Sequence, residues 1–205
     1  RASIELGTSG QTETDAEVPV QARRDWTTAQ VCAEYREWSD KGIAALAAMQ
    51  DEPLAEMVAP LGDLGSHPLH TVANAMVFDH YCHLRHDIGV AVRRAADLPH
   101  DPLALECLIE WMMAGLPQMC AAALEPCRVG VNLVFTDLQH VTYRLVRAPG
   151  DGPWEVHAGT DNSHPVAVTS AHEFVSWATK RSDWRVHTQL SDQAAAATLD
   201  AFNII

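Results

Sequence analysis

The sequence predicts an α+β protein with a helical N-terminal part, residues 1–125, and a small α+β domain with an antiparallel sheet, residues 126–205. In the first part, apolar residues recur at helical spacing over long stretches that are separated by prolines and glycines. From Pro126 onward, short β-branched or alternating runs are divided by turn sequences. The 205 residues, 47% of them hydrophobic, are enough to bury a sizeable core.

Three helices are expected in the first part. The polar segment 8–24 lacks a sustained period and is expected to be a loop or a frayed lead-in to the first helix. Asp25 is expected to cap a helix that runs to about Gln50, with an apolar stripe that needs a packing partner. After a loop rich in proline and glycine, residues 69–96 and 102–124 are expected to form the second and third helices.

The second part is typical of strands followed by short helices. Four expected strands, separated by the turn sequence DLQ, the turn sequence PGDG and one further loop, are RVGVNLVFT, HVTYRLVRA, PWEVHAG and PVAVTS. The later segments are expected to form a short amphipathic helix, a fifth strand and a closing helix: AHEFVSWATKR, RVHTQLS and DQAAAATLDAFNII. The first three strands should form an antiparallel meander.

Composition argues against several classes of partner. The chain has 14 Lys and Arg against 27 Asp and Glu, for a net charge of −13, which repels nucleic acid and anionic lipid surfaces. No apolar run is long enough to span a membrane, and the first residues lack the pattern of a signal peptide. Five cysteines without a CxxC pair favour a reducing compartment. We therefore expect a cytoplasmic protein.

The segment FDHYCHLRHDI, residues 78–88, concentrates groups that can bind metals. On a helix, Asp79 and His83 lie one turn apart and share one face with positions 69, 72, 76, 87 and 90. The first three of these positions are apolar. We expect this face to lie toward the bundle interior, where an unpaired carboxylate costs several kcal/mol. An inward carboxylate and imidazole at this spacing can hold a metal ion. His86 is expected to be solvated.

The same spacing allows other interpretations. Asp79 and His83 can simply hydrogen-bond to each other, as buried polar groups usually do. His80 lies about 60° from His83 around the helix, so a chelate by all three side chains would be strained. Cys82 and Arg85 are expected to point to the opposite side. Two ligands also do not complete a site, because catalytic zinc normally has three protein ligands and an open position.

Several segments resemble one family. VFDHYCHLRHDI, together with LGDLGSHPLH before it and ECLIEWMMAGLPQMCAAAL after it, resembles the mycothiol-dependent maleylpyruvate isomerase family, a branch of the DinB-like metal-binding four-helix bundles. The later segments are similar to the sterol-carrier-like α+β domain that ends these proteins: VNLVF, PWEVHAG, HEFVSWATKRSDWR and LDAFNII. The resemblance covers nearly the whole chain from Asp25.

The resemblance implies a metal site, a thiol cosubstrate and an isomerase or S-transferase activity. In the family three side chains hold a divalent metal, usually zinc, and two of them map onto Asp79 and His83. Mycothiol would attack a small electrophile similar to maleylpyruvate. Arg181 occupies a position where relatives often have an arginine, and we expect it to bind a substrate carboxylate. The alternative for Arg181 is a solvated arginine at a helix C-terminus.

The chain departs from the family at the third ligand, a histidine on an early helix. The segment DWTTAQVCAEY has the expected Trp-Thr start but contains no histidine. Because RASIELG resembles the tail of a helix, we expect the first helix or two, with the third ligand, to precede Arg1. The alternative function is a non-catalytic ligand-binding or regulatory module, in which Asp79 and His83 form a structural pair. The sequence predicts no oligomeric state.

Overall fold

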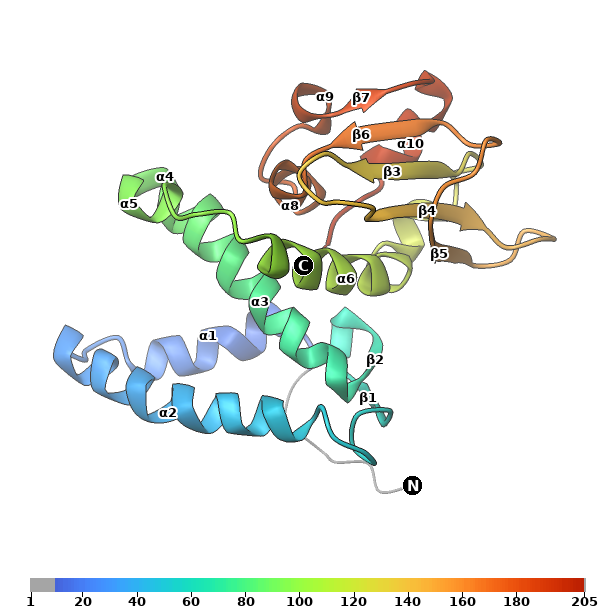
Figure 1. Ribbon diagram of the computed structural model, residues 1–205. Helices are drawn as coiled ribbons and strands as arrows, with labels where there is room; N and C mark the ends of the chain where they lie inside the picture. The colour runs from blue at the N-terminus through green and yellow to red at the C-terminus, as the bar shows by residue number, and fades with distance from the viewer. Residues whose placement is uncertain (1–9, 205) are drawn as a thin grey trace. The chain divides into compact units, whose positions relative to one another are not determined.

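The computed structural model describes residues 10–204 and has the predicted α+β class (Figure 1). The chain divides into two compact units, one up to Ala73 and one from Asn74 onward. The sequence instead places a domain boundary after residue 125, and that domain division stays a prediction. The expected helix tail at residues 1–7 lies outside the described residues.

The first unit contains two helices, α1 (Thr12–Ala22) and α2 (Thr28–Ala48). The expectation of a loop was wrong for residues 12–22, because α1 forms there with its side chains mainly exposed and so leaves no apolar period in the sequence. The N-cap of α2 is Thr27 rather than Asp25. Thr27 Oγ1 accepts from the Gln30 amide at 3.3 Å, and the Gln30 side chain accepts from the Thr27 amide at 2.9 Å.

Two short strands interrupt the expected loop between the first two helices. β1 (Val58–Pro60) pairs antiparallel with β2 (Ser66–Pro68), and the 3₁₀ turn η1 (Gly62–Leu64) lies between them. Each strand is three residues long and ends in proline. Segments this short, with a proline, do not give the alternating pattern that predicts a strand. A second 3₁₀ turn, η2 (Leu69–Thr71), then leads into the next helix.

The expected helix at 69–96 is present, with two departures from a regular α-helix. The regular part, α3 (Val72–Cys82), continues into a π-helical stretch, η3 (His83–Ile88), and then into the single turn α4 (Gly89–Ala91). The extended backbone of Val92, with φ −121° and ψ 91°, separates α4 from α5 (Arg93–Ala96).

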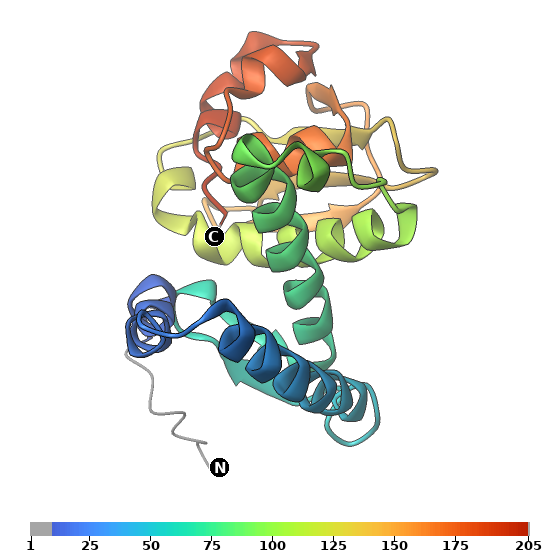
Figure 2. The same cartoon turned by 90° about the vertical axis from the view of Figure 1, so that its left-hand side faces the viewer.

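The third expected helix is formed by α6 (Pro102–Met119) and the short α7 (Ala121–Leu124). Asp101 caps α6 by accepting a hydrogen bond from the Leu103 amide at 2.9 Å. The helix contacts strand β5 and helix α8, and it supplies much of the core of the second unit (Figures 1 and 2). Its buried apolar side chains include Leu105, Leu108, Ile109, Trp111, Met112, Met113 and Leu116.

A five-stranded sheet has the order β5-β4-β3-β6-β7. Its strands are β3 (Val131–Phe135), β4 (Thr142–Arg147), β5 (Trp154–Ala158), β6 (Val166–Thr169) and β7 (Gln189–Leu190). The antiparallel meander β3-β4-β5 was predicted correctly. The expectation of a wholly antiparallel sheet was wrong, because β6 pairs parallel with β3, with Asn132 opposite Val166. Alternating side chains indicate a strand but not its direction.

Short helices follow the strands, as predicted. They are α8 (Ala171–Ala178), α9 (Trp184–His187), the 3₁₀ turn η4 (Gln193–Ala195) and α10 (Ala196–Asp200). The first three residues of the expected fifth strand belong to α9, and β7 is only two residues long. Trp177 and Phe202 stack in the core with ring centroids 5.6 Å apart.

Candidate functional site

Four polar side chains form a continuous row of polar contacts from helix α3 to a residue just beyond the end of α8. The distance from Asp79 Oδ1 to His83 Nε2 is 3.3 Å, and the other ring nitrogen of His83 lies 2.5 Å from Asp87 Oδ2. Arg181 donates to both oxygens of Asp87, from Nε at 2.6 Å and from Nη2 at 2.8 Å. The structure thus brings together all three site residues that the sequence singles out, and it adds Asp87 between them.

The expected orientation of Asp79 and His83 was wrong. Their side chains are 53% and 55% exposed, and Val90 on the same face is 85% exposed. The buried side of the helix instead carries Ala75, Phe78, Tyr81 and Cys82. Because α3 is apolar on more than one side, helical phase alone did not identify the face that packs.

A change of helical geometry begins at His83 itself. The regular α-helix ends at Cys82, and the π-helical stretch covers His83 to Ile88, which includes Asp87. Such π-helical turns are rare and often occur at functional sites. The widened turn contains both the candidate metal ligand and the carboxylate that contacts it.

A helix C-terminus positions Arg181. Helix α8 ends with the Lys180 amide donating to Trp177 O at 3.1 Å and the Arg181 amide donating to Ser176 O at 2.9 Å. Lys180 has a φ of 62°, and this left-handed residue completes a Schellman motif. The motif turns the chain so that the guanidinium of Arg181 reaches Asp87. The simple alternative of a solvated arginine does not hold, since its side chain is 29% exposed and engaged on both oxygens of a carboxylate.

The charges of the site favour an ionised Asp87. The Arg181 guanidinium, followed by the hydrogen bond from His83, lowers the pKa of Asp87 to about 2. Asp87 is therefore a carboxylate at neutral pH. A permanent negative charge faces one nitrogen of His83, and the carboxyl group of Asp79 faces the other.

The separation of Asp79 Oδ1 and His83 Nε2 suits a tetrahedral metal ion. Zinc bonds to oxygen and nitrogen of about 2.0–2.2 Å at the tetrahedral angle place neighbouring ligand atoms about 3.3–3.5 Å apart. The observed distance of 3.3 Å between Asp79 Oδ1 and His83 Nε2 lies in this range of ligand-to-ligand distances. Within residues 10–204, however, no three His, Cys, Asp or Glu side chains form a group that could hold a metal ion. The separation of Asp79 Oδ1 and His83 Nε2 thus fits two ligands of one ion but does not supply a third.

A second cluster, of aromatic rings and imidazoles, was missed by the sequence reasoning. The ring of His172, at the start of α8, lies with its centroid 4.1 Å from His100 and 4.8 Å from His86. The Tyr81 hydroxyl is 3.0 Å from His172 Nδ1, and Arg85 Cζ lies 3.9 Å from the centre of the Tyr81 ring. The expectation that His86 is solvated was wrong, because its Nε2 is buried and has no hydrogen-bond partner among the described residues.

Burial disfavours the charged forms of three of these side chains, His86, His172 and Tyr81. Desolvation lowers the pKa of His86 to about 4, with a further contribution from His172. Desolvation also lowers the pKa of His172 and raises the pKa of Tyr81 to about 12. At neutral pH, His86 and His172 are thus neutral, and Tyr81 keeps its proton. The residues of this cluster are far apart in the sequence, between positions 81 and 172, so no local sequence motif identified them.

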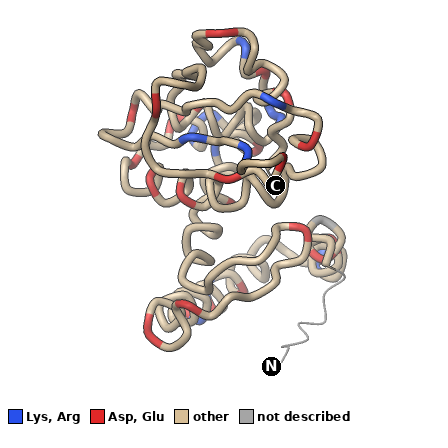
Figure 3. The backbone as a smooth tube through the Cα atoms, turned by 90° about the vertical axis from the view of Figure 1, so that its right-hand side faces the viewer, with Lys and Arg blue, Asp and Glu red and all other residues tan. Residues whose placement is uncertain are grey.

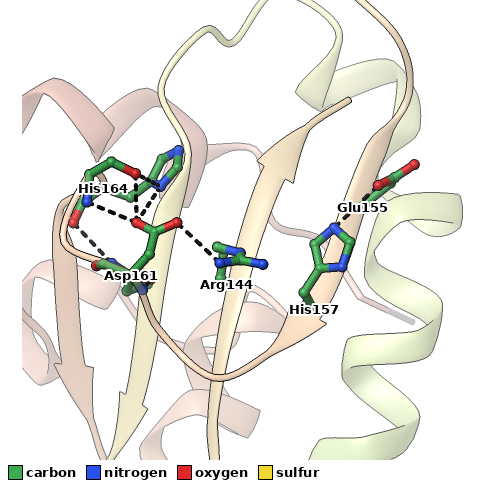
Figure 4. Close-up of polar contacts among 7 residues, drawn as sticks. Arg144, Glu155, His157, Asp161 and His164 are labelled. Atoms are coloured by element: carbon green, nitrogen blue, oxygen red, sulfur yellow. Dashed lines mark hydrogen bonds and ion pairs between the residues drawn. The ribbon is translucent and has the colours of Figure 1, made fainter. Parts of the chain in front are cut away.

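The loop before β6 contains serine, histidine and aspartate but does not form a catalytic triad (Figure 4). His164 Nδ1 lies 2.8 Å from Asp161 Oδ1 and 3.1 Å from Ser163 Oγ, so both groups contact the same ring nitrogen. A triad instead needs the serine on one nitrogen and the carboxylate on the other. Asp161 also receives a hydrogen bond from Arg144 at 3.2 Å. These contacts hold the loop in place.

Other sequence expectations concern charge and cysteines. Figure 3 shows acidic positions spread along both units, in keeping with the net charge of −13. All five cysteines are free, and Cys82, Cys120 and Cys127 are buried. Among the helices of the described residues, none is long and apolar enough to cross a membrane.

Comparisons of the chain with protein-family models, with curated proteins and with solved structures found no match.

Proposed function

We propose that the protein is a metal-dependent isomerase or S-transferase that uses mycothiol and acts on a small electrophile similar to maleylpyruvate. The observation that carries this proposal is the pair of Asp79 Oδ1 and His83 Nε2, 3.3 Å apart on one helix. The resemblance of residues 77–88 to the maleylpyruvate isomerase family supports it, and so does the approach of Arg181 to the same helix. In this proposal the helical part is a DinB-like bundle.

In the proposed site, Asp79 and His83 hold zinc as two of its ligands, and the resemblance assigns a third to a histidine on an earlier helix. A bound zinc ion lowers the pKa of a thiol, so that a thiolate is available at neutral pH. Addition of the thiolate to an electron-poor cis alkene leaves a single bond that can rotate. Expulsion of the thiolate from the resulting enolate would then restore the double bond as trans.

Arg181 is the proposed partner of the substrate carboxylate. Its guanidinium presents several donors in one plane, which matches the geometry of a carboxylate. The arginine already binds a carboxylate, that of Asp87, at 2.6 and 2.8 Å. The substrate's carboxylate would share this guanidinium and place the alkene next to the metal.

Metal analysis tests the proposal. Purified full-length protein should contain or bind about one zinc, nickel or manganese ion per chain, and Asp79→Ala and His83→Ala should each reduce that content severely. His80→Ala is the matched control, because His80 lies on the same helix but its Nδ1 contacts Met76 O at 2.8 Å. Metal-loaded protein should isomerise or conjugate an electrophilic alkene only when mycothiol is added. Failure of the native chain to bind any of these metals stoichiometrically would refute the proposal.

The second candidate is a non-catalytic binding or regulatory module of the same fold. One observation favours it: both ring nitrogens of His83 face carboxylates, as they would in a purely structural arrangement. In that case His83→Ala should lower the free energy of unfolding without any loss of bound metal. Measuring metal content and stability on the same variant separates the two candidates.

A further inference from the structure

We propose that Asp87 is a positioning residue, which fixes the ring of His83 through Nδ1 and so leaves Nε2 turned toward Asp79 as a metal ligand. This inference rests on the proposed metal site and names a residue that the resemblance does not assign. The carboxylate would act through His83 and would not contact the metal itself.

The two contacts of His83 are unequal, and the difference indicates where its proton lies. The distance from Nδ1 to Asp87 Oδ2 is 2.5 Å, a short contact between an imidazole and a carboxylate. The distance from Nε2 to Asp79 Oδ1 is 3.3 Å, which is longer than a charge-assisted hydrogen bond. In the proposed tautomer, the proton on Nδ1 is donated to Asp87 and the lone pair of Nε2 faces Asp79.

In that tautomer, two electron-rich atoms face each other. The Nε2 lone pair and the Asp79 carboxylate oxygen are both acceptors, and at 3.3 Å neither satisfies the other. A cation between them would relieve this contact. Ligand histidines in metal sites usually donate their other ring N–H to a carboxylate or carbonyl in this way, which fixes the tautomer and raises the basicity of the ligand nitrogen.

Arg181 holds Asp87 in the required orientation. The guanidinium binds both oxygens, at 2.6 and 2.8 Å, so the carboxylate cannot rotate freely away from His83. Arg181 comes from the end of α8, ninety-four residues further along the chain. The orientation of His83 thus depends on a segment beyond its own helix, which a merely local contact between residues 83 and 87 would not require.

The first experiment uses metal-free protein and measures the tautomer of His83 by long-range ¹H–¹⁵N NMR at pH 7.5. We expect the Nδ1–H form in the native chain and in Asp87→Glu, and a shift toward the Nε2–H form in Asp87→Ala. Asp97→Asn is the matched control, because Asp97 also pairs with an arginine in a helical turn, Arg93, but does not contact His83. A native ring protonated on Nε2, or on both nitrogens, would overturn the inference.

The second experiment titrates zinc alone into each folded variant against a chromophoric chelator. Removal of such an outer carboxylate typically costs about 10–100-fold in metal affinity, and we expect a loss in this range for Asp87→Ala, partial recovery in Asp87→Glu and no change in Asp97→Asn. Equal zinc affinity of the native chain and Asp87→Ala would overturn the positioning role while leaving the metal site intact. If no variant binds zinc, the proposed function fails, whereas the tautomer measurement still decides whether Asp87 orients His83.

Discussion

The hydroxyl of Tyr81 on α3 lies 3.0 Å from Nδ1 of His172 at the start of α8. The phenol is 3% exposed, and its pKa of about 12 keeps its proton in place. Tyr81 can therefore donate to an unprotonated Nδ1 of His172. This bond connects the helix that carries the candidate metal ligands to the helix whose end carries Arg181.

Replacing Tyr81 with Phe should destabilise the protein. The change keeps the ring but leaves Nδ1 of His172 without this donor, and a buried polar group that loses its partner costs about 1–3 kcal/mol. We expect a decrease in the free energy of unfolding of about 1–2 kcal/mol, measured by chemical denaturation. Tyr35→Phe is the control, since Tyr35 is 63% exposed, and it should change stability little. Equal stability of the two variants would show that the Tyr81 hydroxyl contributes nothing.

Stability should decrease as the pH falls from about 6.5 toward 4. The pKa of His86 is about 4 in the folded chain because of desolvation and the nearby His172, and it is about 6.5 when unfolded. Between these values the unfolded chain binds a proton that the folded chain excludes, so the stabilising effect of a neutral His86 is complete above pH 6.5 and is lost as the pH falls.

The thermal midpoint measured at pH 7.5, 6 and 5 checks this sign. His86→Phe keeps a ring beside His172 but cannot be protonated, so its midpoint should fall less between pH 7.5 and 5 than that of the native chain. The charged groups around the ring are Arg85, Arg181 and Asp87, and they are unchanged in this variant. An identical fall in both chains would assign the pH dependence to other groups.

The sequence predicted the strands more accurately than the helix faces. Apolar alternation identified β3 to β6 because each strand packs at least one face against the core. The direction of β6 depends on which neighbour it pairs with, and no local pattern contains that information. Helix α1 was missed for a related reason, since its exposed side chains give no periodic apolar signal.

The candidate site residues were chosen from the sequence, and their arrangement in space did not follow from it. The spacing of Asp79 and His83 correctly placed them on one side of a helix, where the structure has Asp79 Oδ1 and His83 Nε2 3.3 Å apart. Their exposure differed from the expectation because Phe78 and Cys82 form the packing face instead. The role proposed for Asp87 depends on a contact with Arg181 across ninety-four residues, and such a contact follows from the tertiary fold and not from spacing.

The left-handed conformation of Lys180 should make this position sensitive to side-chain shape. A φ of 62° is readily adopted by glycine but is strained for a β-branched residue. We expect Lys180→Gly to be at least as stable as the native chain and Lys180→Val to be less stable by about 1–2 kcal/mol. Both variants lose the hydrogen bond from Lys180 Nζ to Asp200 O, so the difference between them reports the backbone alone.

The Lys180 variants also connect the Schellman motif to the site. A distorted helix end in Lys180→Val should move Arg181 away from Asp87, and the NMR signal of the Arg181 Nε–H should shift toward its solvent-exposed position. In Lys180→Gly the signal should stay as in the native chain. Unchanged signals together with equal stability would show that the motif does not hold Arg181 in place.

Gly130, which precedes β3, should not tolerate even a methyl group. A Cβ at this position would lie 2.6 Å from His164 Cδ2 and 2.8 Å from the Leu145 carbonyl oxygen, and the backbone carbonyl cannot move without disturbing the pairing of β3 with β4. We expect Gly130→Ala to lower the free energy of unfolding by about 1–3 kcal/mol, as overpacking of a close contact does.

Gly42→Ala is the matched control for the same added methyl group. Gly42 lies within α2, and a Cβ there would meet nothing within 4 Å. Because alanine is favoured over glycine inside a helix by about 1 kcal/mol, this substitution should stabilise the protein, opposite in sign to Gly130→Ala. Chemical denaturation of both variants checks the pair. If both changes shift stability in the same direction, the close approach of His164 and Leu145 to Gly130 does not control the packing of this loop against the sheet.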